Sequence, residues 1–421
     1  MRFPLPSLPV LVLQLISSCP LRIQAFVSLG AAPPFATSES LQTTTYQFAV
    51  PKRFVDNADG VLYVNSDCIN CAACSHFAAD VFRRAASDDH HVAFDQPSAG
   101  DVDRLDRVRA ALSACPVAAI RVERAAKDAA EELFSEDEAL KRKLSLRRKA
   151  SGLDPPFPRP LLPDVDTGVF FLGSHNRASF GATPYLASGR APDGSAVSVM
   201  VDTPKFSSQS VRVVRSLLAE GSLGPDYLFL THVDDTADHL KWRKEFTSLK
   251  RIFHAGDLGR HNWIGDTTLE DVEVLLRSAD EEDEDSFRAW DLNGNPFQVS
   301  LNAGVSWPDE AKGDFLVLHT PGHSPGSIAL LTRRGVLFTG DTYAWTTRDG
   351  GHMSGFPRYG NNMRIQSNTI RKFGKIAGLF DVVAPGHGHV RQYASLATNE
   401  EKEQAKKQDI NAVLEELVRH P

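Results

Sequence analysis

The spacing of the cysteines constrains this chain more than any other feature of its sequence. Cys68, Cys71 and Cys74 are separated by two residues each, and Cys115-Pro116 follows after forty intervening residues. Three thiolates at this spacing can surround one corner of a compact iron–sulfur cluster, and a distant fourth completes the cage. A four-cysteine zinc site would more often show two separate C-x-x-C pairs. We therefore expect one iron–sulfur cluster held by all four cysteines.

These cysteines resemble those of the single-cluster bacterial ferredoxins, in which C-x-x-C-x-x-C is followed by a remote C-P. The only other cysteine, Cys19, lies in a segment that we expect to be removed. Cys71 stands where some three-iron variants have Asp, so the resemblance implies one [4Fe–4S] cluster. A domain of this kind transfers single electrons, senses, or has a structural role.

The length and charge of the chain limit its class. At 421 residues it is too long for one ordinary core. Its 42% apolar and 24% charged residues are typical of a globular protein. The net charge of −7 disfavours nucleic acid as a partner, because phosphate contacts need an excess of Lys and Arg.

The N-terminal region has the composition of a targeting segment. Residues 5–16 are apolar and follow Arg2, but they are too few to span a bilayer and suit the core of a signal peptide. The Gln24-Ala25-Phe26 junction resembles the bipartite presequences of algae with secondary plastids. We therefore predict a plastid location, with no stable membrane span in the mature chain. Ordinary secretion is the alternative, although the cysteine spacing is that of a cluster rather than of disulfides.

Changes in composition divide the chain into five segments. After about residue 168, short apolar runs such as VFFLG and FLVLH are continuous rather than alternating, which indicates strands buried on both faces of an α/β domain. The predicted segments are a targeting presequence (1–45), a ferredoxin-like domain (46–123), a charged and Pro-rich linker (124–165), an α/β domain (166–398) and a C-terminal helix (399–421).

Histidines and aspartates follow four of the predicted strands in the larger domain. The four motifs are His232-Val-Asp234-Asp235-Thr-Ala-Asp238-His239, Thr320-Pro-Gly-His323, Gly340-Asp341 and Pro385-Gly-His387-Gly-His389. Each motif alone is a weak signal, since a single strand-end His is more often structural. Together they bring imidazoles and carboxylates from separate strand ends, which predicts a metal site on loops held by rigid strands.

This set resembles the metallo-β-lactamase superfamily, with its glyoxalase II-like members, whose motifs are H-x-H-x-D-H, T-P-G-H, G-D and P-G-H-G. The resemblance implies an αββα sandwich, here preceded by a small α+β ferredoxin-like domain, and one or two divalent ions, zinc or iron. It implies that His232 and His323 bind a first metal and that Asp341 bridges two. The second metal would be bound by Asp238, His239 and His387, and Asp202 would support the site.

The first motif departs from the family pattern, because the chain reads H-x-D-D-x-x-D-H. Three explanations remain open: Asp234 replaces the second imidazole, a two-residue insert bulges so that one metal is held well, or His254 supplies the missing nitrogen. A carboxylate at Asp234 would harden the site and make iron or manganese more plausible.

Two functions compete. The first is a metal-dependent hydrolase of an ester, thioester or lactone, which uses a metal-bound hydroxide with Asp341 and Asp238 as catalytic residues. In such a hydrolase, the iron–sulfur domain would transfer electrons or act as a sensor. The alternative is an iron-dependent oxidoreductase that receives electrons from the cluster and so needs a redox partner protein. Either acts on a small-molecule substrate, with His319 and His389 as candidates to support the ligands.

Overall fold

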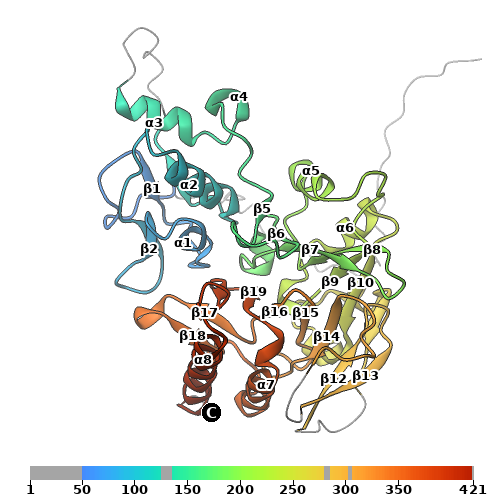
Figure 1. The fold of residues 1–421 in the computed structure, drawn as a ribbon. Coiled ribbons are helices and arrows are strands. Elements are labelled where there is room, and N and C mark those ends of the chain that lie inside the picture. The colour runs from blue at the N-terminus through green and yellow to red at the C-terminus, as the bar shows by residue number, and fades with distance from the viewer. Residues whose placement is uncertain (1–49, 125–134, 279–284, 302–305, 420–421) are drawn as a thin grey trace, which may run out of the picture. The chain divides into compact units, whose positions relative to one another are not determined.

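The computed structural model describes residues 50–124, 135–278, 285–301 and 306–419 (Figure 1). The predicted targeting presequence, residues 1–45, lies outside these ranges. No helix in the described part of the chain combines the length and the apolar character needed to cross a membrane.

The cysteine-containing region is built from two small sheets and two helices. The strands β1 (Leu62–Val64) and β4 (Ile120–Val122) pair antiparallel, as do β2 (Phe82–Arg84) and β3 (His91–Ala93). The helices are α1 (Ala73–Phe77) and α2 (Val102–Ala114). The Asp101 side chain accepts a hydrogen bond from the Arg104 N–H and so caps the start of α2. Helix α2 ends at Cys115 because the residue before a proline is driven out of the helical conformation.

The segment predicted to be a linker has more structure than a tether. It contains α3 (Glu136–Leu144) and α4 (Arg148–Ser151), and its Pro-rich end forms β5 (Arg159–Pro160), which pairs with the next strand. Proline is tolerated in β5 because this strand lies at the edge of its sheet, where one side needs no N–H donor. The larger domain therefore begins inside the range that was predicted to be a linker.

Two seven-stranded sheets form the larger domain. The first has the order β11-β10-β9-β8-β7-β6-β5 and the second the order β13-β12-β14-β15-β16-β19-β20. The first comprises β5, β6 (Val169–Phe171), β7 (Tyr185–Arg190), β8 (Ala196–Val201), β9 (Tyr227–Phe229), β10 (Lys250–His254) and β11 (Val274–Leu276). The second comprises β12 (Ser286–Trp290), β13 (Pro296–Ser300), β14 (Phe315–His319), β15 (Ile328–Thr332), β16 (Val336–Gly340), β19 (Val382–Pro385) and β20 (Arg391–Gln392). A hairpin of β17 (Ala344–Thr346) and β18 (His352–Ser354) follows β16.

Side chains alternate between two cores along the second sheet. Val317 and Phe338 belong to the core shared with the first sheet, whereas Leu316 and Leu337 belong to a second core. This second core includes α7 (Met363–Lys375) and α8 (Asn399–Arg419), so these helices cover the other face of the sheet (Figure 1). Helices α5 (Ser208–Ser216) and α6 (His239–Glu245) pack against the first sheet through Val214 and Trp242. The predicted αββα architecture is confirmed, and β14, β15 and β16 are buried on both faces.

Candidate metal centre and thiol cradle

The four cysteines line a single small cavity, and none of them forms a disulfide. Asn70 and Ala72 have φ angles of 60° and 64°, so the loop between the first three cysteines curls back on itself. Backbone N–H groups of Asn70 and Ala119 donate to Sγ of Cys68 and Cys115, at 3.4 and 3.2 Å. The structure thus brings together all four predicted cluster ligands.

Burial keeps cysteines of this cradle protonated as long as no cation is bound. Burial, with a smaller effect of the neighbouring Cys115 and Cys68, raises the pKa of Cys71 to about 12, although backbone N–H groups lower it. Burial likewise raises the pKa of Cys74 well above its ordinary value. Four thiolates this close repel one another unless cations lie between them, which is the charge that an iron–sulfur cluster supplies.

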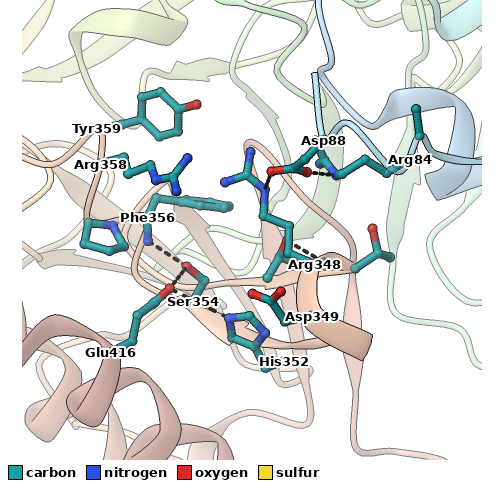
Figure 2. A pocket seen from close by; sticks show the side chains of 14 residues that line it. Arg84, Asp88, Arg348, Asp349, His352, Ser354, Phe356, Arg358, Tyr359 and Glu416 are labelled. Atoms are coloured by element: carbon teal, nitrogen blue, oxygen red, sulfur yellow. Dashed lines mark hydrogen bonds and ion pairs between the residues drawn. The ribbon is translucent and has the colours of Figure 1, made fainter. Parts of the chain in front are cut away.

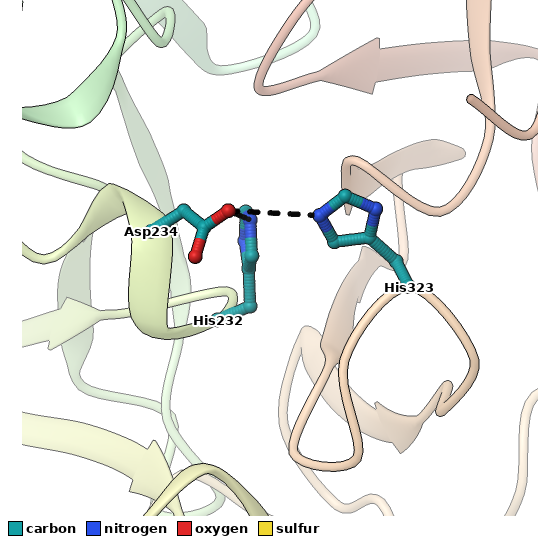
Figure 3. Close-up of side chains that lie close together, drawn as sticks. All are labelled: His232, Asp234 and His323. Atoms are coloured by element: carbon teal, nitrogen blue, oxygen red, sulfur yellow. Dashed lines mark ion pairs between the residues drawn. The ribbon is translucent and has the colours of Figure 1, made fainter. Parts of the chain in front are cut away.

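The four His/Asp motifs converge in the larger domain because each follows the end of a buried strand. His232 follows β9, His323 follows β14, Asp341 follows β16 and His387 follows β19. A short 3₁₀ turn, Val233–Asp235, directly follows His232 and turns Asp234 towards the two imidazoles (Figure 3). Rigid strands therefore fix the positions from which short loops present the side chains.

Two imidazoles and two carboxylates surround one position. Nε2 of His232 lies 3.8 Å from Oδ2 of Asp234, and Nε2 of His323 lies 3.9 Å from the same oxygen (Figure 3). Oδ2 of Asp341 is 3.9 Å from each of these nitrogens. The His232 Nε2 atom is buried and has no hydrogen-bond partner among the described residues. An N and O donor set with an unpaired buried nitrogen fits a divalent cation.

Residues behind the imidazole of His232 hold it in place. Its Nδ1 lies 3.0 Å from Oγ1 of Thr231, and that hydroxyl group and the Thr231 N–H both donate to the buried carboxylate of Asp202. This agrees with the predicted supporting role of Asp202. Such contacts fix the orientation of a ligating ring.

A second group of polar atoms adjoins the first. Nδ1 of His387 lies 2.9 Å from Oδ1 and Oδ2 of Asp341. Asp235 is 0% exposed, and neither of its carboxylate oxygens has a hydrogen-bond partner among the described residues. Although burial lowers the pKa of His387, the charges of Asp341 and Asp235 raise it to about 10. Burial raises the pKa of Asp235 well above its ordinary value. One ligand atom each of His232, Asp235 and Asp341 lies within 4.8 Å of the others.

Two predicted ligands do not belong to this cluster. The carboxylate of Asp238 accepts hydrogen bonds from Lys241 at 2.6 Å and from Asn176 at 2.9 Å, and His239 contacts Asp266 and Arg251. The structure therefore does not group Asp238 and His239 with the other predicted ligands, and the metal and catalytic roles given to them stay predictions. The turn after His232 brings Asp234 and Asp235 close to the imidazole of His232. Helix α6 begins at His239, whose ring contacts Asp266 and Arg251.

Of the three explanations for the altered motif, the geometry supports replacement of an imidazole by Asp234. The imidazole of His254 stacks on that of His319 at 4.4 Å, and its Nε2 contacts Ser278, so it does not supply a missing nitrogen. Asp235 was missed by the sequence analysis. Its position directly after Asp234 in H-x-D-D was the available signal.

The metal centre and the thiol cradle face the same cavity. Residues Val50–Pro421 form one unit, and within it a cavity of about 460 Å³ is lined by Cys71 and by Asp234, His323, Asp341 and His387. His389 lines it too and contacts Ser75, next to Cys74, at 3.2 Å. A chemical group bound in this cavity would therefore touch both the cysteine loop and the metal ligands.

Comparisons with known proteins found one family model for the cysteine region and a number of similar solved structures. Residues 64–122 match the family model of the 4Fe-4S single cluster domain of Ferredoxin I. The DIM-1 metallo-β-lactamase is a similar solved structure, with 13% identity, a TM-score of 0.35, and coverage of 58% of this chain and 95% of that chain. A metallo-β-lactamase from Hirschia baltica has 15% identity and a TM-score of 0.33, with 59% and 95% covered. A metallo-β-lactamase family protein from Thermus thermophilus has 16% identity and a TM-score of 0.34, with 60% and 80% covered.

No curated protein sequence matches the chain. The cysteine region is thus similar to a single-cluster 4Fe–4S ferredoxin domain, and the larger region, by its own sheet order and ligand positions, is an αββα sandwich that resembles the metallo-β-lactamase fold.

Proposed function

We propose that this protein is an oxidoreductase in which a [4Fe–4S] cluster supplies single electrons to a substrate held at a non-haem iron site. The observation that carries this proposal is the shared cavity, which Cys71 and the metal ligands line together. Hydrolysis needs no electrons, and a hydrolase gains nothing from a cluster ligand beside its substrate.

The donor set supports iron. Two imidazoles and one carboxylate, with open coordination positions, are the ligands of non-haem iron(II) oxygenases. His232, His323 and Asp234 provide this set, and Asp341 adds a second carboxylate oxygen. Replacing a nitrogen by an oxygen ligand makes a site harder, which favours iron over zinc.

A short run of atoms connects the two centres. A Cβ built on Gly181 would lie 3.0 Å from Sγ of Cys71, so the backbone of Gly181 is in contact with this cluster ligand. Phe180 precedes Gly181, and its backbone interacts with the imidazole of His387 and helps to raise the pKa of that ring. His387 in turn contacts Asp341 at 2.9 Å. We infer that electrons pass from the cluster to the candidate metal site along these residues.

The proposed reaction is a two-electron reduction of a small molecule. Iron, when bound, supplies an open coordination position at which the substrate is polarised. His232, Asp234, His323 and Asp341 hold this position, and His387 holds a proton next to Asp341. Two electrons, delivered singly by a redox partner protein through the cluster, and two protons from water reduce the substrate. The partner is oxidised by one electron at each delivery.

A metal-dependent hydrolase is the second candidate, and one observation favours it. The buried carboxylate of Asp235, beside Asp341 and His387, offers donors for a second cation. The chemistry that a pair of divalent ions supplies is activation of water for attack on an ester, thioester or lactone. In that function the native metal would be zinc.

Metal content and electron transfer test the proposal. We expect protein purified without oxygen, from cells supplied with both iron and zinc, to contain one iron beyond the four of the cluster. After mild oxidation, photochemical reduction by one electron per chain should remove the ferric signal of the mononuclear site in freeze-quench electron paramagnetic resonance. Zinc in the larger domain, or a ferric signal that persists while the cluster is reduced and reoxidised, would overturn the proposal.

A further inference from the structure

Exposed aromatic side chains gather around one cavity. Among the described residues, the large aromatic side chains that remain exposed are Phe180 at 49%, Trp263 at 60% and Tyr359 at 67%. All three line the cavity that contains the metal ligands, together with Phe356. Large apolar side chains left in water at one place usually indicate a binding site. Their flat faces suit a flat ligand, because ring-on-ring contact adds to simple burial.

An arginine pair also lines this cavity. Arg84, from β2 of the cysteine domain, and Arg348, after β17, both line it. Only Asp88 forms ion pairs with them among the described residues, at 3.2 Å from Arg84 and 3.6 Å from Arg348 (Figure 2). Among these three side chains, one carboxylate therefore faces two guanidinium groups. Burial and the charge of Arg348 both lower the pKa of Arg84. The surroundings therefore destabilise the charged form of this guanidinium group.

This arginine pair joins two cavities. A second cavity, of about 480 Å³, shares Arg84, Arg348, Phe356 and Tyr359 with the first and adds Arg358 together with the acidic Asp349 and Glu416. Figure 2 shows the guanidinium groups of Arg348 and Arg358 turned towards each other in this second cavity. Arg84 and Arg348 therefore line both the polar second cavity and the aromatic cavity that contains the candidate metal ligands.

We propose that the substrate is a planar, conjugated molecule with one oxyanion group. Its flat body lies against Phe180, Trp263 and Tyr359, and its oxyanion is bound by Arg348 and Arg84. This inference rests on the proposed function, because it places the group to be reduced at the metal ligands. Guanidinium groups bind carboxylate and phosphate in the same forked geometry, so both oxyanions fit. A volume of about 460 Å³ suits a small molecule of this kind.

The first cavity contains both cationic and aromatic side chains for such a ligand. The oxyanion of the ligand reduces the repulsion between the charges of Arg84 and Arg348. The flat body of the ligand covers the exposed aromatic side chains and removes their faces from water. Arg84 also donates a 2.7 Å hydrogen bond to Oδ1 of Asn70 in the cysteine loop. A ligand held by Arg84 is thereby placed next to the loop that carries Cys71, as electron transfer to it requires.

Isothermal titration calorimetry of the intact, metal-loaded protein without oxygen tests this assignment with four probes. They are naphthoate, naphthyl phosphate, naphthamide and decahydronaphthoate. We expect naphthoate or naphthyl phosphate to bind about tenfold more tightly than naphthamide, which lacks the charge, and than decahydronaphthoate, which is not flat. The tighter of the two anions identifies the oxyanion. Equal binding of naphthoate, naphthamide and decahydronaphthoate would overturn the proposal.

Variants separate binding by arginine from binding to the metal. Arg348→Gln should weaken naphthoate binding about tenfold and leave naphthamide unchanged, and Tyr359→Leu should weaken both. Arg333→Gln is the matched control, since Arg333 pairs with Asp314 and lines neither cavity. Unchanged naphthoate affinity in Arg348→Gln would overturn the assignment. The measurement needs no electron transfer, so a zinc-containing protein that still binds naphthoate through Arg348 would refute only the oxidoreductase function.

Discussion

The indole Nε1 of Trp263 donates a 2.7 Å hydrogen bond to Oδ1 of Asp234. This contact occupies one carboxylate oxygen and leaves Oδ2 facing His232 and His323, at 3.8 and 3.9 Å. Trp263 is 60% exposed, yet it orients a candidate metal ligand. The same side chain thus connects the mouth of the cavity with the metal centre.

Removing this hydrogen bond should weaken metal binding. We expect Trp263→Phe to lower the affinity of the mononuclear site about tenfold, because contacts behind a ligand typically have an effect of this size. Iron release to a chelator measures it. Trp307→Phe is the matched control, since its Nε1 donates to the Ala311 carbonyl at 2.8 Å and it lines no cavity described above. Equal iron release from both variants would contradict the role of Trp263.

Two aspartates of the first motif should differ in their effect on metal content. Asp234→Asn replaces a charged ligand by a neutral one and should lose the mononuclear iron while keeping the four cluster irons. Asp238→Asn should keep all of the iron, because Asp238 contacts Lys241 and Asn176. Elemental analysis with cluster absorbance measures both. Iron loss in Asp238→Asn and not in Asp234→Asn would reverse the ligand assignment.

Gly181 should be essential for the cysteine loop. A Cβ at this position would lie 2.8 Å from Cβ of Cys71, and the φ angle of +91° is unfavourable for any other residue. We expect Gly181→Ala to accelerate cluster loss under chelation, followed by absorbance. Gly194→Ala is the matched control. Its φ angle of +82° is similarly unfavourable for alanine, but no atom lies within 4 Å of the added Cβ. If Gly194→Ala lost its cluster equally fast, backbone strain rather than contact with Cys71 would be the cause.

The ion pairs of Glu273 should contribute stability that depends on pH. Burial alone would raise the pKa of Glu273, but hydrogen bonds from Arg251 and Arg243 lower it from 4.5 to about 2. A lowered folded-state pKa stabilises the fold above pH 4.5, and this contribution disappears as the pH falls towards 2. Solvent reaches part of the carboxylate, so Glu273→Gln should reduce the unfolding free energy by only about 1 kcal/mol at neutral pH.

Urea unfolding of wild type and Glu273→Gln at a series of pH values checks this expectation. The difference between the two should be largest at neutral pH and should shrink below pH 4.5, where the unfolded carboxyl group becomes protonated. A difference that stays constant down to about pH 3 would show that the substituted amide costs stability through packing rather than through charge.

Some features of the site follow from local sequence. The C-x-x-C-x-x-C spacing with a remote Cys-Pro defined the thiol cradle, since a cluster needs close thiolates whatever surrounds it. Continuous apolar runs identified strands buried on both faces, and the structure has them at β14, β15 and β16. His323, Asp341 and His387 were predicted as ligands because each follows a predicted strand and matches a motif of the metallo-β-lactamase superfamily.

Other features depended on the tertiary structure. A single 3₁₀ turn places Asp234 and Asp235, rather than Asp238 and His239, beside His232, and the direction of this turn depends on what packs against it. The order of residues along the chain also does not predict which surfaces of the two domains are in contact. The contact of Gly181 with Cys71, and the cavity shared by thiols and metal ligands, arise from packing between residues distant along the chain.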